Sequence, residues 1–150
     1  MEGATEIACI ALGSNLGDRD AQLQFARDAI AGLPGTRVVA KSSVEETAPV
    51  GDVPQGPYLN QMIAVETSLP PHTLLSELQR IEHAAGRVRA ERWGPRTLDL
   101  DIVRYGARRI AEPDLVIPHP EIERRDFWRR ELRELDATLR TGAATTGGRR

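Results

Sequence analysis

The order of strand-like and helix-like segments constrains the fold of this 150-residue chain more than any other feature. Apolar or alternating runs typical of strands occupy residues 7–12, 37–45, 58–67 and 97–105. Apolar residues at helical spacing run from Leu23 to Leu33 and again from Pro70 to Ala85, where Gly86 is expected to close the helix. This order predicts an α+β, ferredoxin-like βαββαβ sandwich, in which both helices cover one face of a four-stranded antiparallel sheet.

The segment after residue 105 predicts shorter additions to this core. Leu115 to Ile117 is expected to form a further short strand or a turn. A C-terminal helix is predicted from four apolar residues at helical spacing, namely Trp128, Leu132, Leu135 and Leu139. Residues 141–150 are small, polar and glycine-rich, so we expect a disordered tail. Residues 1–140 are therefore expected to form a single domain.

Composition narrows the class of protein. A hydrophobic fraction of 40% and a charged fraction of 28% are ordinary for a globular protein. No apolar run approaches the ~18–20 residues of a membrane span, and the N-terminus carries acids where a signal peptide carries basic residues. Cys9 is the only cysteine, which excludes an intrachain disulfide and a cysteine-based zinc site. We expect a cytoplasmic protein with no membrane contact.

Charge is distributed unevenly along the chain. The net charge is −2, which argues against general nucleic-acid binding. Residues 1–86 hold five basic and eleven acidic side chains, whereas residues 87–150 hold fifteen basic and eleven acidic ones. The second half therefore predicts an electropositive region that suits an anionic ligand.

The sequence Leu98-Asp99-Leu100-Asp101-Ile102 places two carboxylates on one face of a predicted strand. Their Cα atoms are expected to lie roughly 6.6–7 Å apart. Mg²⁺ takes oxygen ligands, commonly one or two carboxylates together with substrate phosphates. Two such ions, ~3.5–4 Å apart, could be held by this pair. An ordinary solvated strand face has the same alternation, so spacing alone leaves both interpretations open.

A cluster of arginines lies just before this strand. Arg87, Arg89, Arg92 and Arg96 fall in a predicted loop that also contains Trp93. One guanidinium group can donate two parallel hydrogen bonds to phosphate oxygens, and it keeps its charge at all relevant pH values. A basic loop beside paired carboxylates is typical of a metal–polyphosphate site. The alternative is a surface loop whose arginines pair with acidic side chains.

Other candidates surround these two motifs. Tyr58 and Asn60 follow a loop rich in glycine and proline, and together they suit a flat heteroaromatic ligand. Phe127 could face Tyr58 across such a ligand, although both rings could equally pack in the core. His119, between two prolines, could bind a phosphate or be an ordinary loop histidine.

Taken in order, these segments resemble the 6-hydroxymethyl-7,8-dihydropterin pyrophosphokinase family of folate biosynthesis. The resemblance runs from Ile7 to about Phe127. It is carried by Ala11-Leu12-Gly13-Ser14-Asn15-Leu16-Gly17, Glu46-Thr47-Ala48-Pro49-Val50-Gly51, Tyr58-Leu59-Asn60, Gly86-Arg87-Val88-Arg89, the string Arg92 to Ile102, Pro118-His119-Pro120 and Arg125-Asp126-Phe127. The family implies a ferredoxin-like fold and the transfer of diphosphate from ATP to the pterin hydroxymethyl group, with release of AMP.

The resemblance also implies roles for individual residues. Asp99 and Asp101 would hold two Mg²⁺ ions and form the catalytic set with Arg87 and Arg96. The nucleotide would be bound by Leu75, Glu82, Arg87, Arg89, Arg92, Trp93, Ile102, His119 and Arg125. The pterin would be bound by Thr47, Ala48, Val50, Tyr58, Asn60, Trp93, Asp99 and Phe127, with Tyr58 and Phe127 on its two faces. The expected partners are these small-molecule substrates, bound by a monomer, with no nucleic acid.

The chain departs from the family pattern after Phe127. An apolar stretch containing proline is usual there, whereas this chain continues with a charged, helical segment that begins at Trp128. The departure concerns the packing around Arg125 and Phe127, and we expect the catalytic core to be retained. Two other functions are compatible with the fold. An RNA-binding module would need the aromatic strand motif that this chain lacks, and an inactive scaffold would not need the intact aspartates and arginines.

Overall fold

The computed structural model describes residues 4–15, 17–48, 57–89 and 98–141. The sheet strands are β1 (Glu6–Ser14), β2 (Thr36–Lys41), β3 (Glu45–Thr47), β4 (Tyr58–Thr67) and β5 (Asp99–Tyr105). The helices are α1 (Arg19–Ala31), α2 (Pro71–Arg89) and α3 (Asp126–Thr141). A small hairpin of β6 (Ile110–Glu112) and β7 (Leu115–Ile117) and a 3-10 turn (Pro120–Glu123) link β5 to α3. The predicted order of strands and helices is confirmed.

The main sheet has the strand order β2-β4-β1-β5, with every neighbouring pair antiparallel. This is the arrangement expected for a ferredoxin-like sandwich, with the first and third core strands in the centre. The short strand β3 adds a second partner to β4 by pairing Glu45 with Asn60 and Thr47 with Tyr58. The sheet therefore extends to five strands at the end where β1 and β5 carry the glycine and aspartate motifs.

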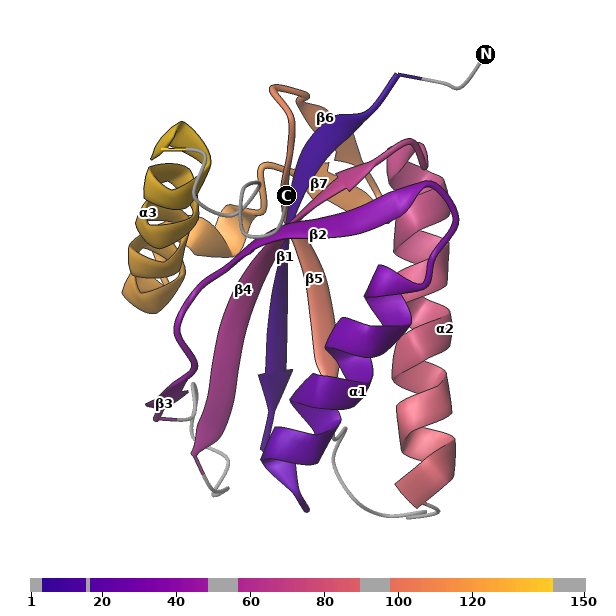
Figure 1. Cartoon of the computed structure of the whole chain (residues 1–150), viewed down its shortest axis with the longest axis vertical. Coiled ribbons are helices and arrows are strands. Elements are labelled where there is room, and N and C mark those ends of the chain that lie inside the picture. Colours follow the sequence, from indigo (N-terminus) through magenta and orange to yellow (C-terminus); the bar gives the residue numbers. More distant parts are fainter. Residues whose placement is uncertain (1–3, 16, 49–56, 90–97, 142–150) are drawn as a thin grey trace.

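Helices cover both faces of the sheet (Figure 1). On one face, α1 and α2 pack against alternate residues of β1, among them Ile10 and Leu12. On the other face, α3 packs against Cys9, Ala11 and their neighbours on β2 and β4. Because both faces are buried, β1 and β4 are apolar along most of their length instead of alternating with polar residues.

Capping and ion pairs fix the helices. Asp18 accepts a hydrogen bond from Ala21 N at 3.0 Å and so begins α1. On the opposite face, α3 is joined to the sheet by two arginine–carboxylate pairs. Arg104 of β5 meets Asp136 at 2.6 Å, and Arg130 of α3 meets Glu45 of β3 at 2.8 Å. The second pair ties α3 to the strand that borders the cavity described below.

Two boundaries predicted from the sequence were wrong. Helix α2 does not close at Gly86 but continues to Arg89, so the backbone of Arg87 and Arg89 lies in its last turn and not in a loop. A Cβ at Gly86 would meet no atom of the described residues within 4 Å, so this glycine adds no crowding to the helix there. The predicted strand over residues 37–45 is divided into β2 and β3, because Ser42 turns inward and its hydroxyl accepts a hydrogen bond from Met62 N.

The predicted C-terminal helix is confirmed as α3, which ends at Thr141. The predicted disordered tail otherwise falls on residues 142–150, outside the described part of the chain. Within residues 4–15, 17–48, 57–89 and 98–141, no helix combines the length and apolarity that crossing a bilayer requires.

Candidate active site

Two cross-strand rows of residues form the floor of a cavity on the α3 face of the sheet. In the first row, Gly13 of β1 pairs with Asn60 of β4 on one side and Asp99 of β5 on the other. In the second row, Ala11 pairs with Met62 and with Asp101. Residues paired across antiparallel strands point to the same face. The register therefore places both carboxylates beside the smallest residues of β1, with the Asn60 amide opposite.

The small side chains of β1 keep this floor open. A Cβ added at Gly13 would lie 3.1 Å from Asn60 Oδ1 and 3.6 Å from Tyr58 Cδ2, so a larger residue would crowd both. The resulting cavity has a volume of about 370 Å³, within the range of small-molecule sites. Its lining consists of Ala11, Leu12, Gly13, Thr47, Ala48, Tyr58, Asn60, Asp99, Asp101, Arg125, Phe127 and Trp128.

The walls come from β3, β4 and the start of α3. Asn60 is buried, and its Nδ2 donates to Thr47 Oγ1, which fixes the amide orientation relative to β3. Opposite them stand Phe127 and Trp128 from the first turn of α3. Burial and the nearby Asp99 carboxylate raise the pKa of Tyr58, while Arg125 lowers it. Tyr58, Asp99 and Arg125 are therefore close enough to act on one another electrostatically.

His119 lies beside the second aspartate. Its Nδ1 accepts a hydrogen bond from Glu121 N at 3.1 Å, which assigns the proton of the neutral ring to Nε2. That Nε2 is 3.7 Å from Asp101 Oδ1. The histidine is therefore aimed at the carboxylate pair by a backbone contact, as expected for a residue that would bind an anion or position a metal ligand.

Another residue that is predicted to bind the nucleotide contacts the outer edge of β5. Glu82 of α2 accepts a hydrogen bond from Leu100 N at 2.7 Å, so it supports the strand that presents the two aspartates. Leu75 packs against the core beneath α1 and α2, and Ile102 is 3% exposed within that core. Because its side chain is buried there, Ile102 could contact a nucleotide only through its backbone.

The structure thus gathers Thr47, Ala48, Tyr58, Asn60, Asp99, Asp101, Arg125 and Phe127 around one cavity, and it places His119 against Asp101. Val50, Arg92, Trp93 and Arg96 lie outside the described residues, as do the side chains of Arg87 and Arg89. Sequence reasoning assigned Trp128 only to helix packing. Its place next to Phe127 gave no such signal, because successive residues of a helix point in different directions.

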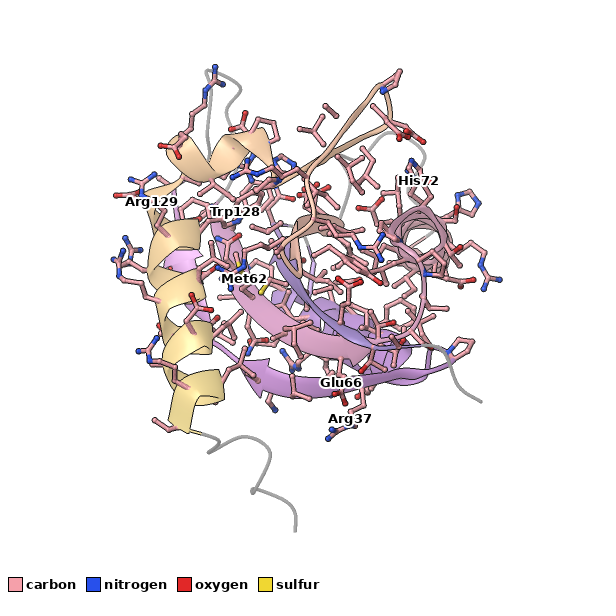
Figure 2. The ribbon with its side chains drawn as sticks, turned by 90° about the horizontal axis from the view of Figure 1, so that it is seen from above. Arg37, Met62, Glu66, His72, Trp128 and Arg129 are labelled. Carbon is pink, nitrogen blue, oxygen red and sulfur yellow. The ribbon has the colours of Figure 1, made fainter. Side chains whose placement is uncertain are left out.

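A second group of potential metal ligands lies elsewhere, at the start of α2. His72 Nε2 is 3.0 Å from Glu112 Oε1 and 3.3 Å from Asp114 Oδ1 of the β6–β7 hairpin. These are hydrogen-bond distances, and all three side chains are about half exposed. Figure 2 shows His72 on the opposite side of the molecule from Trp128. An exposed histidine between two carboxylates accounts for this group without a metal.

Comparison with known proteins identifies relatives of this chain. Residues 9–137 match the model of the 7,8-dihydro-6-hydroxymethylpterin-pyrophosphokinase (HPPK) family. The chain belongs to this family. It is 42% identical over 138 residues to the 2-amino-4-hydroxy-6-hydroxymethyldihydropteridine pyrophosphokinase of Methylorubrum extorquens, covering 92% of this chain and 87% of that one. It is 48% identical over 120 residues to the enzyme of the same name from Haemophilus influenzae, covering 80% and 75% of the two chains.

Solved structures agree on the HPPK fold. The Plasmodium falciparum HPPK-DHPS crystal structure with SDX-DHP superposes with a TM-score of 0.65 at 15% identity. The match covers 83% of this chain and 40% of that one, so this chain spans about two fifths of the length of that protein. Family membership and these named relatives make the chain an ATP-dependent pterin pyrophosphokinase of folate biosynthesis. The predicted family and fold are confirmed.

Proposed function

We propose that the cavity above β1 is where this HPPK-family chain binds hydroxymethyldihydropterin and brings it to the β-phosphate of ATP. The observation that carries this proposal is the register that puts Asn60, Gly13 and Asp99 in one row, with Asp101 in the next. Together the two rows place a hydrogen-bonding amide at one end of a flat floor and two carboxylates at the other. A flat heterocycle with a reactive arm fits between them.

The pterin occupies the end of the cavity formed by β3, β4 and α3. Asn60 offers both a donor and an acceptor to the ring edge, and Thr47 and Ala48 of β3 border the same edge. Tyr58 and Phe127 line the cavity from β4 and α3, and they are assigned to the two faces of the ring. Val50 and Trp93, outside the described residues, complete this set by their place in the family motifs.

ATP lies on the β5 side of the cavity. Arg125 and His119 provide cationic or donor groups beside the carboxylates, and Glu82 of α2 contacts the outer edge of β5. Leu75, on the same helix, is assigned to this side by its place in the family pattern. Arg87 and Arg89, in the last turn of α2, continue toward the segment that holds Arg92 and Arg96. These four arginines are assigned to the phosphates because guanidinium groups neutralise and orient polyphosphate oxygens. Ile102 contributes its backbone.

Asp99 and Asp101 fit a magnesium site. They are half-buried, share one face of β5 and present only oxygen atoms, the donors that Mg²⁺ requires. We assign two ions to this pair, together with the phosphate oxygens of ATP. When bound, Mg²⁺ neutralises phosphate charge and lowers the pKa of a coordinated hydroxyl.

The reaction needs positioning more than covalent chemistry by the protein. The pterin hydroxyl oxygen attacks the β-phosphorus and its proton passes to solvent, while the bond from that phosphorus to the oxygen bridging the α- and β-phosphates breaks and AMP leaves with that oxygen. Asn60 and the aromatic walls hold the pterin so that its hydroxymethyl arm points toward Asp99. Arg125 and the arginines upstream of β5 hold the phosphates in line. The chain is assigned to the cytoplasm and to action as a monomer on these small molecules.

Metal binding tests the assignment directly. Mn²⁺ would be titrated into the protein with a non-hydrolysable ATP analogue, and bound ions counted by electron paramagnetic resonance. We expect two ions per chain, and at most one in Asp99→Asn and Asp101→Asn. Asp114→Asn, an exposed carboxylate on the β6–β7 hairpin, is the control and should retain both. Wild-type stoichiometry in both cavity variants would refute the assignment of the metal to this pair.

A further inference from the structure

Trp128 connects the two cationic or donor side chains that stand next to the aspartates. It is 2% exposed, lies in the first turn of α3 and lines the cavity. Figure 2 shows its side chain directed toward the sheet near Met62, whereas the next residue, Arg129, points away from the sheet. The indole is therefore fixed between the core on one side and the site on the other.

Each of the two neighbours touches the indole ring in a favourable geometry. The Arg125 guanidinium carbon lies 4.7 Å from the ring centroid, within the range of a cation–π contact. The His119 ring meets the indole edge to face, with 5.0 Å between centroids and an interplanar angle of 88°. One buried ring thus contacts both a cation and an imidazole.

Arg125 also forms an ion pair, but its Nε makes no hydrogen bond among the described residues. The Nε is buried, and Glu121 Oε1 pairs with it at 3.6 Å, a separation longer than a hydrogen bond. His119 has a backbone contact through Nδ1, and the indole is a second contact on its imidazole ring. The indole therefore restrains both side chains in addition to the ion pair of Arg125 and the backbone contact of His119.

We propose that Trp128 is a positioning residue that holds Arg125 and His119 toward the phosphates of ATP. The inference rests on the proposed function, because it assumes that these two side chains bind the nucleotide. It assigns to the charged C-terminal segment a role in nucleotide affinity in addition to its packing role. The part of the sequence that departs from the family pattern thus begins with a residue that serves the site.

The test separates positioning from packing. Trp128→Leu removes the aromatic face but keeps apolar bulk, whereas Leu132→Ala removes core packing one turn later without touching Arg125 or His119. We expect Trp128→Leu to raise KM for MgATP about tenfold, the scale of a lost cation–π contact at a partly desolvated site. Leu132→Ala should lower the melting temperature at least as much and leave that KM unchanged.

A double-mutant cycle sharpens the result. Arg125→Ala should weaken ATP binding in the wild-type background and have a much smaller effect after Trp128→Leu, because the arginine is then already misplaced. If Trp128→Leu fails to fold, Trp128→Phe replaces it in the cycle and should raise KM about threefold, since phenylalanine is a weaker cation–π partner. An unchanged KM, or additive effects of the two substitutions, would overturn the positioning role.

Different outcomes test the proposed function and the role of Trp128. Wild-type protein that forms no AMP in the presence of the pterin would contradict the reaction itself. Retained AMP formation, with a wild-type KM for MgATP in Trp128→Leu, would refute only the role of Trp128. An Arg125→Ala variant with a wild-type KM would also refute that role, because the indole would then have no nucleotide ligand to hold.

Discussion

Glu131 makes the stability of this protein depend on pH in an unusual direction. The residue is on the buried face of α3, is 0% exposed and has no well-formed hydrogen bond to either carboxyl oxygen among the described residues. Burial, together with the neighbouring Glu45 and Glu134 carboxylates, raises its pKa from 4.5 to about 9, although Arg130 lowers it. Burial alone would raise the pKa of Glu45, but the neighbouring Glu131 carboxyl group and the Arg130 guanidinium lower it. Glu131 is therefore protonated in the folded protein at neutral pH.

The size of this pH effect on the free energy of unfolding follows from the linkage between proton binding and folding. The folded state keeps a proton that the unfolded chain releases above pH 4.5, so the free energy of unfolding falls as pH rises from 4.5 toward about 9. Each pH unit in this window costs about 1.4 kcal/mol, which gives about 3 kcal/mol lost by pH 7 relative to strongly acidic conditions. Glu131→Gln has the shape of the protonated side chain and cannot ionise. The variant should match the wild type near pH 4.5 and exceed its stability by about 3 kcal/mol at pH 7.

Urea unfolding at several pH values between 5 and 8 measures this difference. For m-values of about 2 kcal/mol per M, the variant's midpoint should lie more than about 1 M above that of the wild type at pH 7. Subtracting the two curves at each pH removes the titration of all other groups. Glu123→Gln, an exposed glutamate in the preceding turn, is the control and should show no pH-dependent difference. A difference that does not change with pH, or a less stable Gln variant at pH 8, would refute the reasoning.

Two further predictions concern the cavity floor and a helix cap. Gly13→Val should raise KM for the pterin at least tenfold, with a smaller effect on KM for ATP, because the valine side chain would crowd Asn60 and Tyr58. Steady-state kinetics with each substrate varied in turn measures both constants. Equal effects on the two KM values would mean that the pterin binds elsewhere. Asp18→Ala should cost about 1 kcal/mol in urea unfolding by removing the cap of α1, and it should leave kcat unchanged. An unaltered unfolding midpoint would mean that the cap contributes nothing.

The core of the fold could be predicted because its signals are strong and local. Strands β1, β4 and β5 and the three helices follow from apolar periodicity, and the start of α2 follows also from its prolines. The end of α2 could not be predicted from Gly86, because one exposed glycine costs a helix only about 1 kcal/mol and two arginines, which favour helix, lie among the three residues that follow it. The division between β2 and β3 depends on Ser42 bonding to β4, a long-range contact.

The site was predictable to the extent that it lies on strands. The alternation of Asp99 and Asp101 correctly placed both carboxylates on one face, and Asn60 on the neighbouring strand joins them through the register. The buried position of part of α3 could not be predicted, because many of its residues are charged. Glu131 occupies the same helical face as Trp128 and Leu135, yet its residue type argued for solvent. Only the packing of α3 on the sheet shows that it is buried there.

The nucleotide product is the most direct measurement of the central claim. The protein would be incubated with Mg²⁺, ATP and 6-hydroxymethyl-7,8-dihydropterin, and AMP would be resolved from ADP by chromatography. The account predicts pterin-dependent AMP in a one-to-one ratio with pterin diphosphate, lost in both Asp99→Ala and Asp101→Ala and retained in Asp114→Ala. ADP as the nucleotide product, or undiminished AMP formation in the two cavity variants, would contradict it.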